Sequence, residues 1–313
     1  MAKETPRRRP LSWSPSYFWS IPKQIWLHPN NQNRRIWALA RSILWQGYKR
    51  ITGKPITIRI FGTLRLRCYP DSVGASSVVY FGDYHEFNEM HFLRRFLRPG
   101  DSYIDGGANI GTYSLLAARM VGPGGKVIAF EPDPVAAARF RENIALNRFT
   151  NIEVNEVALS DSPGVIRFSE GWDVSNRILG PMETGVRVAE VNTVRLDDHL
   201  AHDTAYAMAK FDLEGSELAA LRGAHEHLIT GNPPVWQLEA TETQLQKLGN
   251  SRREVTTFLR DCGYTFGAYD ARTGRLSFLD EVTPAHHDFF AIHTPAREMV
   301  LERIASENRK YRS

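Results

Sequence analysis

The stretch "DSYIDGGANIGTYSLLA", residues 101–117, limits what this chain can fold into more than any other segment. A short apolar run ends at Asp105, two glycines follow at once, and Gly111 stands just before a segment with helical spacing. Glycines let the backbone turn tightly and pass close to a ligand, because no Cβ intervenes. The pattern therefore predicts a strand at 102–105 that turns through a ligand-binding loop into a helix at 110–120.

Beyond this turn, predicted strands and helices alternate. Strands are predicted at 102–105, 126–131, 152–158, 206–212, 234–239, 264–269 and 289–293, and helices at 110–120, 134–147, 216–228 and 251–261. Such alternation is typical of βαβ units, so we expect an α/β fold with a mostly parallel, seven-stranded sheet and helices on both faces. Ligands of such sheets bind beyond the carboxyl ends of the strands, where the strand order reverses.

The first hundred residues follow a different pattern. Residues 1–50 contain ten Lys or Arg and one acid, a net charge of +9, and five of the seven tryptophans. We expect an irregular arm over 1–30 and an amphipathic helix over 34–50. We then expect a β-hairpin around Gly62 and a lid-like helix at 86–97. The predicted organisation is an arm and helix at 1–50, a hairpin and lid at 51–98, a ligand-binding domain at 99–295 and a helical tail at 296–313.

Composition limits the cellular location and the partners that the protein can have. No apolar run approaches the roughly 18 residues that a membrane span needs. The two cysteines are far apart and show no metal-ligand spacing, which favours a reducing, cytoplasmic location. Two roles stay open for the basic arm: peripheral contact with a membrane, or packing of Trp37, Leu44 and Tyr48 against the catalytic domain or a sister subunit. A nucleic-acid partner is disfavoured, because residues 51–313 carry a net charge of −5.

A second motif, "AFEPDP", places Glu131 at the end of the next strand, followed by Pro132 and Asp133. A carboxylate there can accept both hydroxyl hydrogens of a ribose. Dinucleotides and S-adenosylmethionine both contain one. The dinucleotide motif G-x-G-x-x-G differs from D-G-G-A-N-I-G, in which Asn109 is an addition. Acids at or near several strand ends also suit a cationic sulfonium better than a pyrophosphate; these acids are Asp105, Glu131, Asp161, Asp212 and Glu214.

A third motif, "AKFDLEGSELAALRGA", follows the fourth predicted strand. Asp212 at its tip would face the reactive end of the ligand, and Glu214 lies in the turn that follows. The alternative is that both carboxylates stabilise the N-terminus of the next helix through its dipole.

Four ordered segments resemble the FkbM-type methyltransferase family. They are "FGDYHEFNEMHFLRRFLRPGDSYIDGGANIGTYS", "AFEPDP", "NIEVNEVALSD" and "AKFDLEGSELAALRGA", and the similarity runs from about residue 80 to 240. The resemblance implies a class I, Rossmann-like methyltransferase fold, S-adenosylmethionine as cofactor, and O-methylation, often of sugar hydroxyls in glycans, glycolipids or secondary metabolites.

The resemblance also assigns a cofactor site. It implies that Asp105, Gly107, Asn109 and Gly111 surround the methionine part, Glu131 the ribose, Ala158 and its neighbours the adenine, and Asp212 the methyl group. Pro132 and Asp133 are also expected to bind the cofactor. Gly106 departs from the family pattern, which more often has an apolar residue such as Val there. We expect a looser turn at Gly106 that still binds the cofactor.

Methylation of a sugar hydroxyl requires a base, because the hydroxyl is a poor nucleophile until its proton leaves. The candidates are Asp212, Glu214, Glu239, His85 and Glu86. No metal site is predicted, although a divalent ion held by these acids could replace the base. Two other classes remain open at this stage: a nicotinamide-dependent oxidoreductase, and a non-catalytic Rossmann-like module that acts through its arm.

Overall fold

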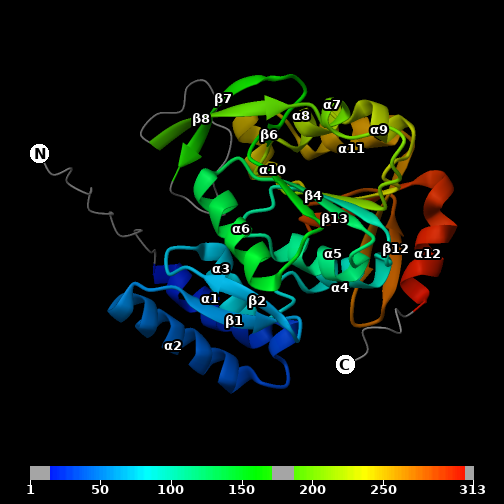
Figure 1. The fold of residues 1–313 in the computed structure, drawn as a ribbon. Helices are drawn as coiled ribbons and strands as arrows, with labels where there is room; N and C mark the ends of the chain where they lie inside the picture. The colour runs from blue at the N-terminus through cyan, green and yellow to red at the C-terminus, as the bar shows by residue number, and fades with distance from the viewer. Residues whose placement is uncertain (1–14, 171–186, 307–313) are drawn as a thin grey trace, which may run out of the picture.

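The computed structural model describes residues 15–170 and 187–306, and its centre is a twisted sheet of eight strands (Figure 1). The strand order is β12–β11–β13–β10–β9–β3–β4–β5, and the five strands from β10 to β5 run parallel. These strands are β3 (Ser102–Gly106), β4 (Lys126–Phe130), β5 (Ile152–Asn155), β9 (Met208–Phe211), β10 (Val235–Glu239), β11 (Tyr264–Asp270), β12 (Arg275–Leu279) and β13 (Asp288–His293). The mostly parallel α/β sheet predicted from the sequence is thus present.

The prediction of seven strands was wrong by one. The additional strand, β12, pairs antiparallel with β11 at the edge of the sheet, with Tyr269 opposite Leu276. Apolar and polar residues alternate over only a short stretch of β12, and only Leu276 among its residues is buried. An edge strand with so little buried surface leaves a weak hydrophobic pattern, so it was not among the predicted strands.

Helices cover both faces of the sheet. One face packs against α4 (Phe87–Phe96), α5 (Thr112–Val121) and α12 (Arg297–Ala305), and the other against α7 (Leu196–His199), α8 (Glu217–Arg222), α9 (His225–Ile229) and α11 (Arg252–Asp261). The remaining helices of this domain are α6 (Pro134–Asn147) and the short α10 (Glu242–Leu245). Each face therefore has its own hydrophobic core.

The helix predicted over 216–228 is two helices, α8 and α9, that meet at Gly223. A Cβ at Gly223 would lie 1.9 Å from the carbonyl oxygen of Ser160, so only glycine permits this contact. Ser160 directly follows β6, the first strand of a three-stranded sheet inserted after β5. The strands of this sheet are β6 (Ala158–Leu159), β7 (Gly164–Glu170) and β8 (Arg187–Val194). The close approach holds this inserted sheet against the main domain.

The segment before residue 70 is more ordered than predicted. Residues 15–30 were expected to be irregular, but Pro15–Leu27 forms helix α1. Ile25 is buried, and the Asn31 side chain donates to the carbonyls of Ile25 and Tyr80, which ties the end of α1 to α3 (Val73–Phe81). Helix α2 (Arg35–Thr52) and the hairpin of β1 (Ile56–Ile60) and β2 (Leu64–Cys68) complete this N-terminal layer.

One expectation about the amphipathic helices was wrong, and one of the roles left open for the α2 residues is met only in part. Helix α4 is not a lid, because Phe92 and Phe96 are fully buried in the core beside α5 and β11. Of the three α2 residues considered for packing against the domain, Tyr48 is partly buried against the core, and the other two are not. Trp37 and Leu44 are 58% and 65% exposed, and Trp45 on the opposite side of the helix makes the inward contact.

Side chains of α6 connect the N-terminal layer to the sheet. Asn147 pairs with both backbone groups of Arg65 in β2. Asn143 accepts a hydrogen bond from the backbone N–H of Arg67 (2.7 Å) and donates one to the carbonyl of Ile110 (3.0 Å). The hairpin is thereby joined to the loop that follows β3. None of the helices in the described part of the chain is long and apolar enough to span a membrane.

Candidate active site

The candidate site lies where the strand order reverses, between the carboxyl ends of β3 and β9. Gly107, just after β3, has a φ of +77°, and a Cβ there would lie 1.9 Å from the carbonyl oxygen of Asp212, just after β9. Only glycine allows the two loops to touch backbone to backbone. The glycine turn therefore sets the position of the loop that carries Asp212.

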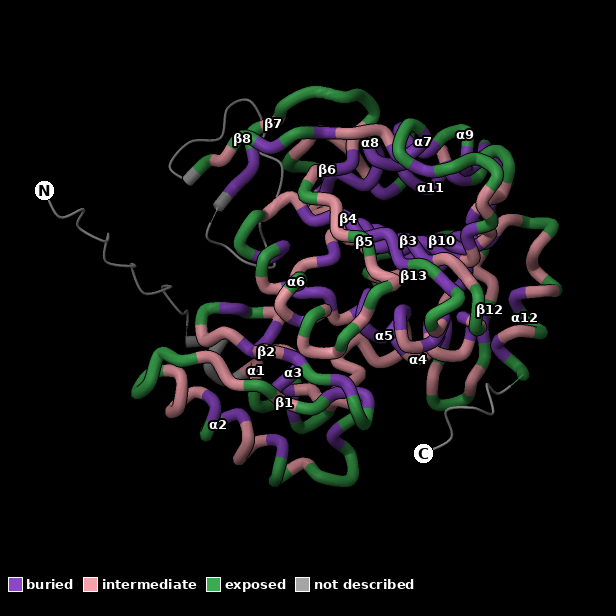
Figure 2. Tube along the Cα trace, in the orientation of Figure 1, coloured by how far each residue is buried: buried purple, intermediate pink, exposed green. Residues whose placement is uncertain are grey.

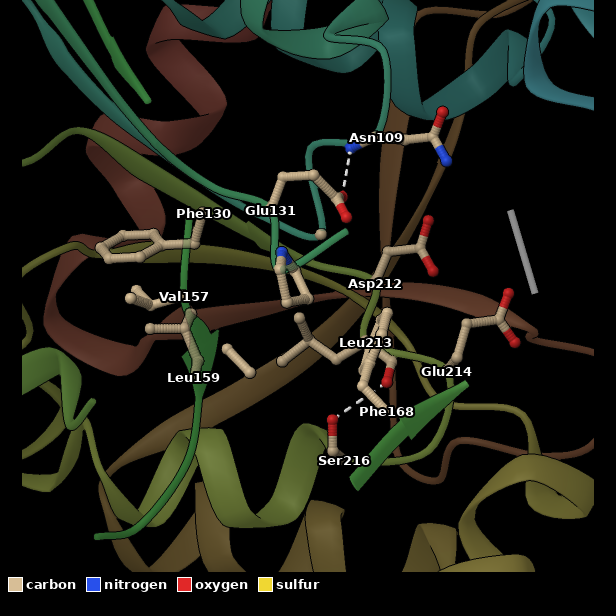
Figure 3. Close-up of a pocket in the computed structure, with 13 residues that line it drawn as sticks. Asn109, Phe130, Glu131, Val157, Leu159, Phe168, Asp212, Leu213, Glu214 and Ser216 are labelled. Carbon is tan, nitrogen blue, oxygen red and sulfur yellow. Dashed lines mark hydrogen bonds between the residues drawn. The ribbon is translucent and has the colours of Figure 1, made fainter. Parts of the chain in front are cut away.

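A pocket of about 640 Å³ opens at this point. It is lined by Gly107, Asn109, Phe130, Glu131, Pro132, Val157, Ala158, Leu159, Phe168, Asp212, Leu213, Glu214 and Ser216. Figure 3 shows the carboxylates of Asp212 and Glu214 on one side of it and Phe130, Val157 and Leu159 on the other. One wall is therefore polar and acidic, and the opposite wall is apolar.

Glu131 is held in this pocket by backbone groups. One carboxylate oxygen accepts the N–H of Asn109 (2.7 Å) and the other accepts the N–H of Asp133 (2.9 Å). Burial raises the pKa of Glu131 to about 8, although both hydrogen bonds act in the opposite direction. A carboxylate offers about four lone-pair directions, so two remain for a ligand.

The other positions of the glycine turn are fixed by large side chains. A Cβ at Gly106 would lie 2.7 Å from the Phe211 ring, and one at Gly111 would lie 2.1 Å from the Phe140 ring. The looser turn expected at Gly106 is therefore absent, because Phe211 fills the space that an apolar side chain would occupy. Asn109 has a φ of +49°, which turns its backbone N–H toward Glu131.

A buried lysine neutralises the acids at the end of β9. Lys210 is 4% exposed, and its Nζ lies 3.0 Å from Oδ2 of Asp212. Burial alone would lower the pKa of Lys210, but Asp212, Asp105 and Glu86 together raise it above its usual value. Asp105 is fully buried and accepts a hydrogen bond from Ser114 (2.5 Å). Burial raises the pKa of Asp105, and Lys210 opposes that shift.

Glu86, on the segment before α4, reaches the same lysine from the other side. Its Oε2 accepts the hydroxyl of Tyr113 (2.5 Å), which in turn accepts a hydrogen bond from Gln237 (3.0 Å). Lys210 also lies over the Tyr113 ring, 4.8 Å from its centroid. The His85 ring lies 3.7 Å from Glu86, and burial lowers the pKa of His85.

Two further carboxyl groups join this cluster from the antiparallel side. Glu239 ends β10 and Asp288 begins β13, and the two residues are direct partners across the strands. The charge of Asp212, burial and Asp288 raise the pKa of Glu239 above its usual range. Burial, Glu86 and Glu89 raise the pKa of Asp288 well above its usual range. Several carboxyl groups thus lie near the positive charge of a single lysine.

The hydrogen bonds at the turn into α8 are made by Glu217. The backbone N–H groups of Leu213 and Gly215 both donate to Glu217, which stabilises the turn into α8. Glu214 has a φ of +53° and accepts a hydrogen bond from the Gln244 side chain (2.6 Å). The carboxylate that stabilises this turn is therefore Glu217.

The predicted site residues fall into three groups. Those that line the pocket are Gly107, Asn109, Glu131, Pro132, Ala158, Asp212 and Glu214. Those in the cluster around Lys210 are Asp212, Glu239, Glu86 and His85. Those behind the pocket wall, which position its backbone, are Asp105, Gly106, Gly111 and Asp133.

Sequence reasoning missed Tyr113, Gln237 and Asp288. Gln237 is a buried polar residue between the apolar residues Trp236 and Leu238 of the strand "VWQLE", which was a usable signal. Asp288 required the knowledge that β13 is antiparallel, since only then does its beginning lie at the site. Among residues 15–170 and 187–306, no group of three or more His, Cys, Asp or Glu side chains is arranged to hold a metal ion.

The strand order and the pocket at its reversal point define a class I methyltransferase fold. Residues 105–266 match the Methyltransferase FkbM domain. The chain therefore belongs to the FkbM methyltransferase family and is an S-adenosylmethionine-dependent methyltransferase. Family membership selects this class over the oxidoreductase and the non-catalytic module.

Two curated relatives are similar to much of the chain. One is the 31-O-demethyl-FK506 methyltransferase FkbM of Streptomyces tacrolimicus, 30% identical over 57% of this chain and 79% of its own length. The other is the 2-O-methyltransferase NoeI of Sinorhizobium fredii, 28% identical over 42% of this chain and 60% of its own. A solved O-methyltransferase from Thermotoga maritima overlays on 65% of this chain and 63% of its own, with 15% identity and a TM-score of 0.35.

The residues present fit S-adenosylmethionine. Glu131 retains two acceptor directions for the ribose hydroxyls. The apolar wall, which includes Phe130, Leu159 and Phe168, suits the adenine ring. The carboxylates of Asp212 and Glu214 suit a cation.

Proposed function

We propose that this enzyme transfers a methyl group to a hydroxyl oxygen of a sugar in a glycan, glycolipid or secondary metabolite. The observation that carries the proposal is the carboxyl cluster around Lys210, which reaches the pocket at Asp212. Carboxyl groups accept hydrogen bonds from hydroxyls, so an edge rich in them suits an acceptor with several hydroxyls. The names of both curated relatives refer to an oxygen position, which is consistent with this chemistry.

Asp212 is the residue that we propose as the base. It is the member of the Lys210 cluster that also lines the pocket. Glu239 and Asp288 belong to the same cluster, but neither lines the pocket. The acceptor hydroxyl gives its proton to the Asp212 carboxylate as its oxygen forms the new bond to carbon.

The remaining groups align and desolvate the reactants. When bound, S-adenosylmethionine supplies a methyl group that its positive sulfur has already activated, and it leaves as S-adenosylhomocysteine. Lys210 keeps Asp212 fixed at 3.0 Å, and Tyr113 and Gln237 hold Glu86 beside it. Such alignment is the main contribution that a protein makes to a displacement of this kind.

The proposal is tested with purified enzyme and S-adenosylmethionine that carries a tritiated methyl group. Extracts from cells that lack the gene supply unmodified acceptor. We expect label in a sugar-containing fraction, and mass spectrometry of that fraction should show a gain of one CH₂ unit on a sugar oxygen. Label that appears only in fractions without sugar, or on nitrogen or carbon, would refute the acceptor class. Calorimetric titration with S-adenosylhomocysteine reports separately on the cofactor site.

A further inference from the structure

Helix α2 exposes its apolar side. Five large hydrophobic residues recur along one side of it and are between 58% and 86% exposed; they are Ile36, Trp37, Ile43, Leu44 and Ile51. We call these five residues the α2 face. The packed side of the helix carries Ala38, Ser42 and Trp45, and Trp45 donates a hydrogen bond to Ser76 in α3. Helix α2 is thus bound to the domain by its less apolar side.

The α2 face lies at the outer edge of the molecule, away from the main sheet (Figure 2). Beside it is a groove of about 820 Å³ between α2, β1 and α3. Its lining is mostly apolar and includes Trp37, Leu44 and Tyr48 from α2. Exposed apolar surface of this kind marks an interaction site, because water contact with it is unfavourable.

The charge around this face is mostly positive, although Asp83 also lines the groove. Residues 15–70 contain ten Lys or Arg and no Asp or Glu. Arg34 precedes α2 and is exposed, Arg50 and Lys54 are exposed at its other end, and Arg59 lines the groove. The apolar residues are therefore bordered by cations along the length of the helix.

We propose that the α2 face binds an anionic membrane surface. Helices with an apolar side and a basic border lie in the plane of a bilayer interface, where Trp is favoured and Lys and Arg contact lipid phosphates. This inference does not depend on which acceptor is methylated.

The charges decide between this occupant and two others. A second copy would bring the same basic patch against itself, because a two-fold contact pairs identical surfaces. A nucleic acid would match the cations but would leave Ile36, Ile43 and Ile51 against phosphates rather than buried. An anionic bilayer would both bury the apolar residues and place the cations beside lipid phosphates.

The test is flotation of the full chain with lipid vesicles. One set contains phosphatidylcholine with about one-third phosphatidylglycerol, and the other contains phosphatidylcholine alone. We expect the protein to float with the anionic vesicles, and the bound fraction to fall when salt rises from about 0.05 M to about 0.5 M. The double variant Ile43→Ser/Leu44→Ser should lower the partition coefficient about tenfold or more.

The matched control changes two exposed aliphatic residues elsewhere, Ile229→Ser/Val165→Ser, and should float like the unmodified protein. Unchanged binding of S-adenosylhomocysteine by each variant shows that the fold is intact. The proposal is overturned if the protein does not float, if it floats equally with neutral vesicles, or if the Ile43/Leu44 variant floats normally. Sedimentation of a dimer that this variant abolishes, without flotation, would identify the face as a subunit interface instead.

Discussion

The two halves of the sheet edge that meet at Gly107 hold their carboxylates in different ways. On the β4 side, Glu131 accepts one backbone N–H on each oxygen and lies beside an apolar wall. On the β9 and β10 side, Asp212, Glu239 and Asp288 compete for the charge of one lysine. Backbone dipoles stabilise the first carboxylate, and a single side-chain cation stabilises the others.

This difference indicates that the two sides of the site have separate roles. Groups held by the backbone are preorganised, so the Glu131 side should contribute to cofactor affinity with little dependence on other side chains. Groups that share one cation are coupled, so a change at any of them should alter the protonation of the rest. The Lys210 side should therefore govern turnover and stability.

The largest effect is expected from Lys210→Met. It removes the cation that compensates the buried carboxylate of Asp105 and the partly exposed carboxylate of Asp212, so we expect a loss of about 3–5 kcal/mol in the free energy of unfolding. The control is Lys126→Met. Lys126 also contacts a carboxylate, Glu153 at 2.8 Å, but is 54% exposed, and its loss should cost about 1 kcal/mol or less. Urea unfolding measures both, and similar losses would contradict the assigned role of Lys210.

The second prediction concerns turnover. Asp212→Asn keeps the shape of the side chain but removes its charge and basicity, so kcat should fall about a hundredfold or more. Binding of S-adenosylhomocysteine should change much less, which calorimetry can check. Near-normal turnover would show that Asp212 has a structural role, and the search for the base would move to Glu239 and His85.

A smaller effect, on binding rather than turnover, is expected at Glu131. Glu131→Ala removes the acceptor for the ribose hydroxyls and should weaken S-adenosylhomocysteine binding by more than about tenfold. The backbone N–H groups of Asn109 and Asp133 also lose their partner, so a melting curve should accompany the titration. If affinity is unchanged in a folded variant, Glu131 does not bind the ribose.

The smallest effect, for a change of one pH unit, is a pH dependence of stability. The pKa of Glu131 is raised to about 8 in the fold, so between about pH 4.5 and 8 the folded state binds a proton that the unfolded state has lost. Stability from this group therefore falls as pH rises through that window, by at most about 1.4 kcal/mol per pH unit. Urea unfolding of the unmodified protein and of Glu131→Gln, without cofactor, should differ by this slope. A difference that rises with pH would contradict it.

Much of the cofactor half could be predicted from the sequence, because its chemistry is encoded locally. A glycine turn after one strand and an acid after the next strand place Glu131 at the same edge as Asp105 once the strands are parallel. The side that contains Lys210 was less predictable. Asp288 and Gln237 reach the cluster only through the antiparallel pairing of β13 and the buried face of β10.

The orientation of α2 could not be predicted for a different reason. Periodicity shows that a helix has an apolar side but not which way that side faces. Trp45 and Ser76 settle it through a buried hydrogen bond between segments 31 residues apart. A long-range contact of this kind leaves no periodic trace in the sequence.

The side chain of Asn143 has a consequence for how this chain can vary. Its oxygen holds Arg67 of the hairpin and its nitrogen holds Ile110 beside the glycine turn, segments 76 and 33 residues away from it. A substitution that shifts either segment by about an ångström would break one of the two bonds, since hydrogen bonds weaken steeply outside a narrow range of distance. The hairpin and the glycine turn are thus constrained to evolve together, and grafting this catalytic core onto a different N-terminal layer would require a new partner for the loop at Ile110.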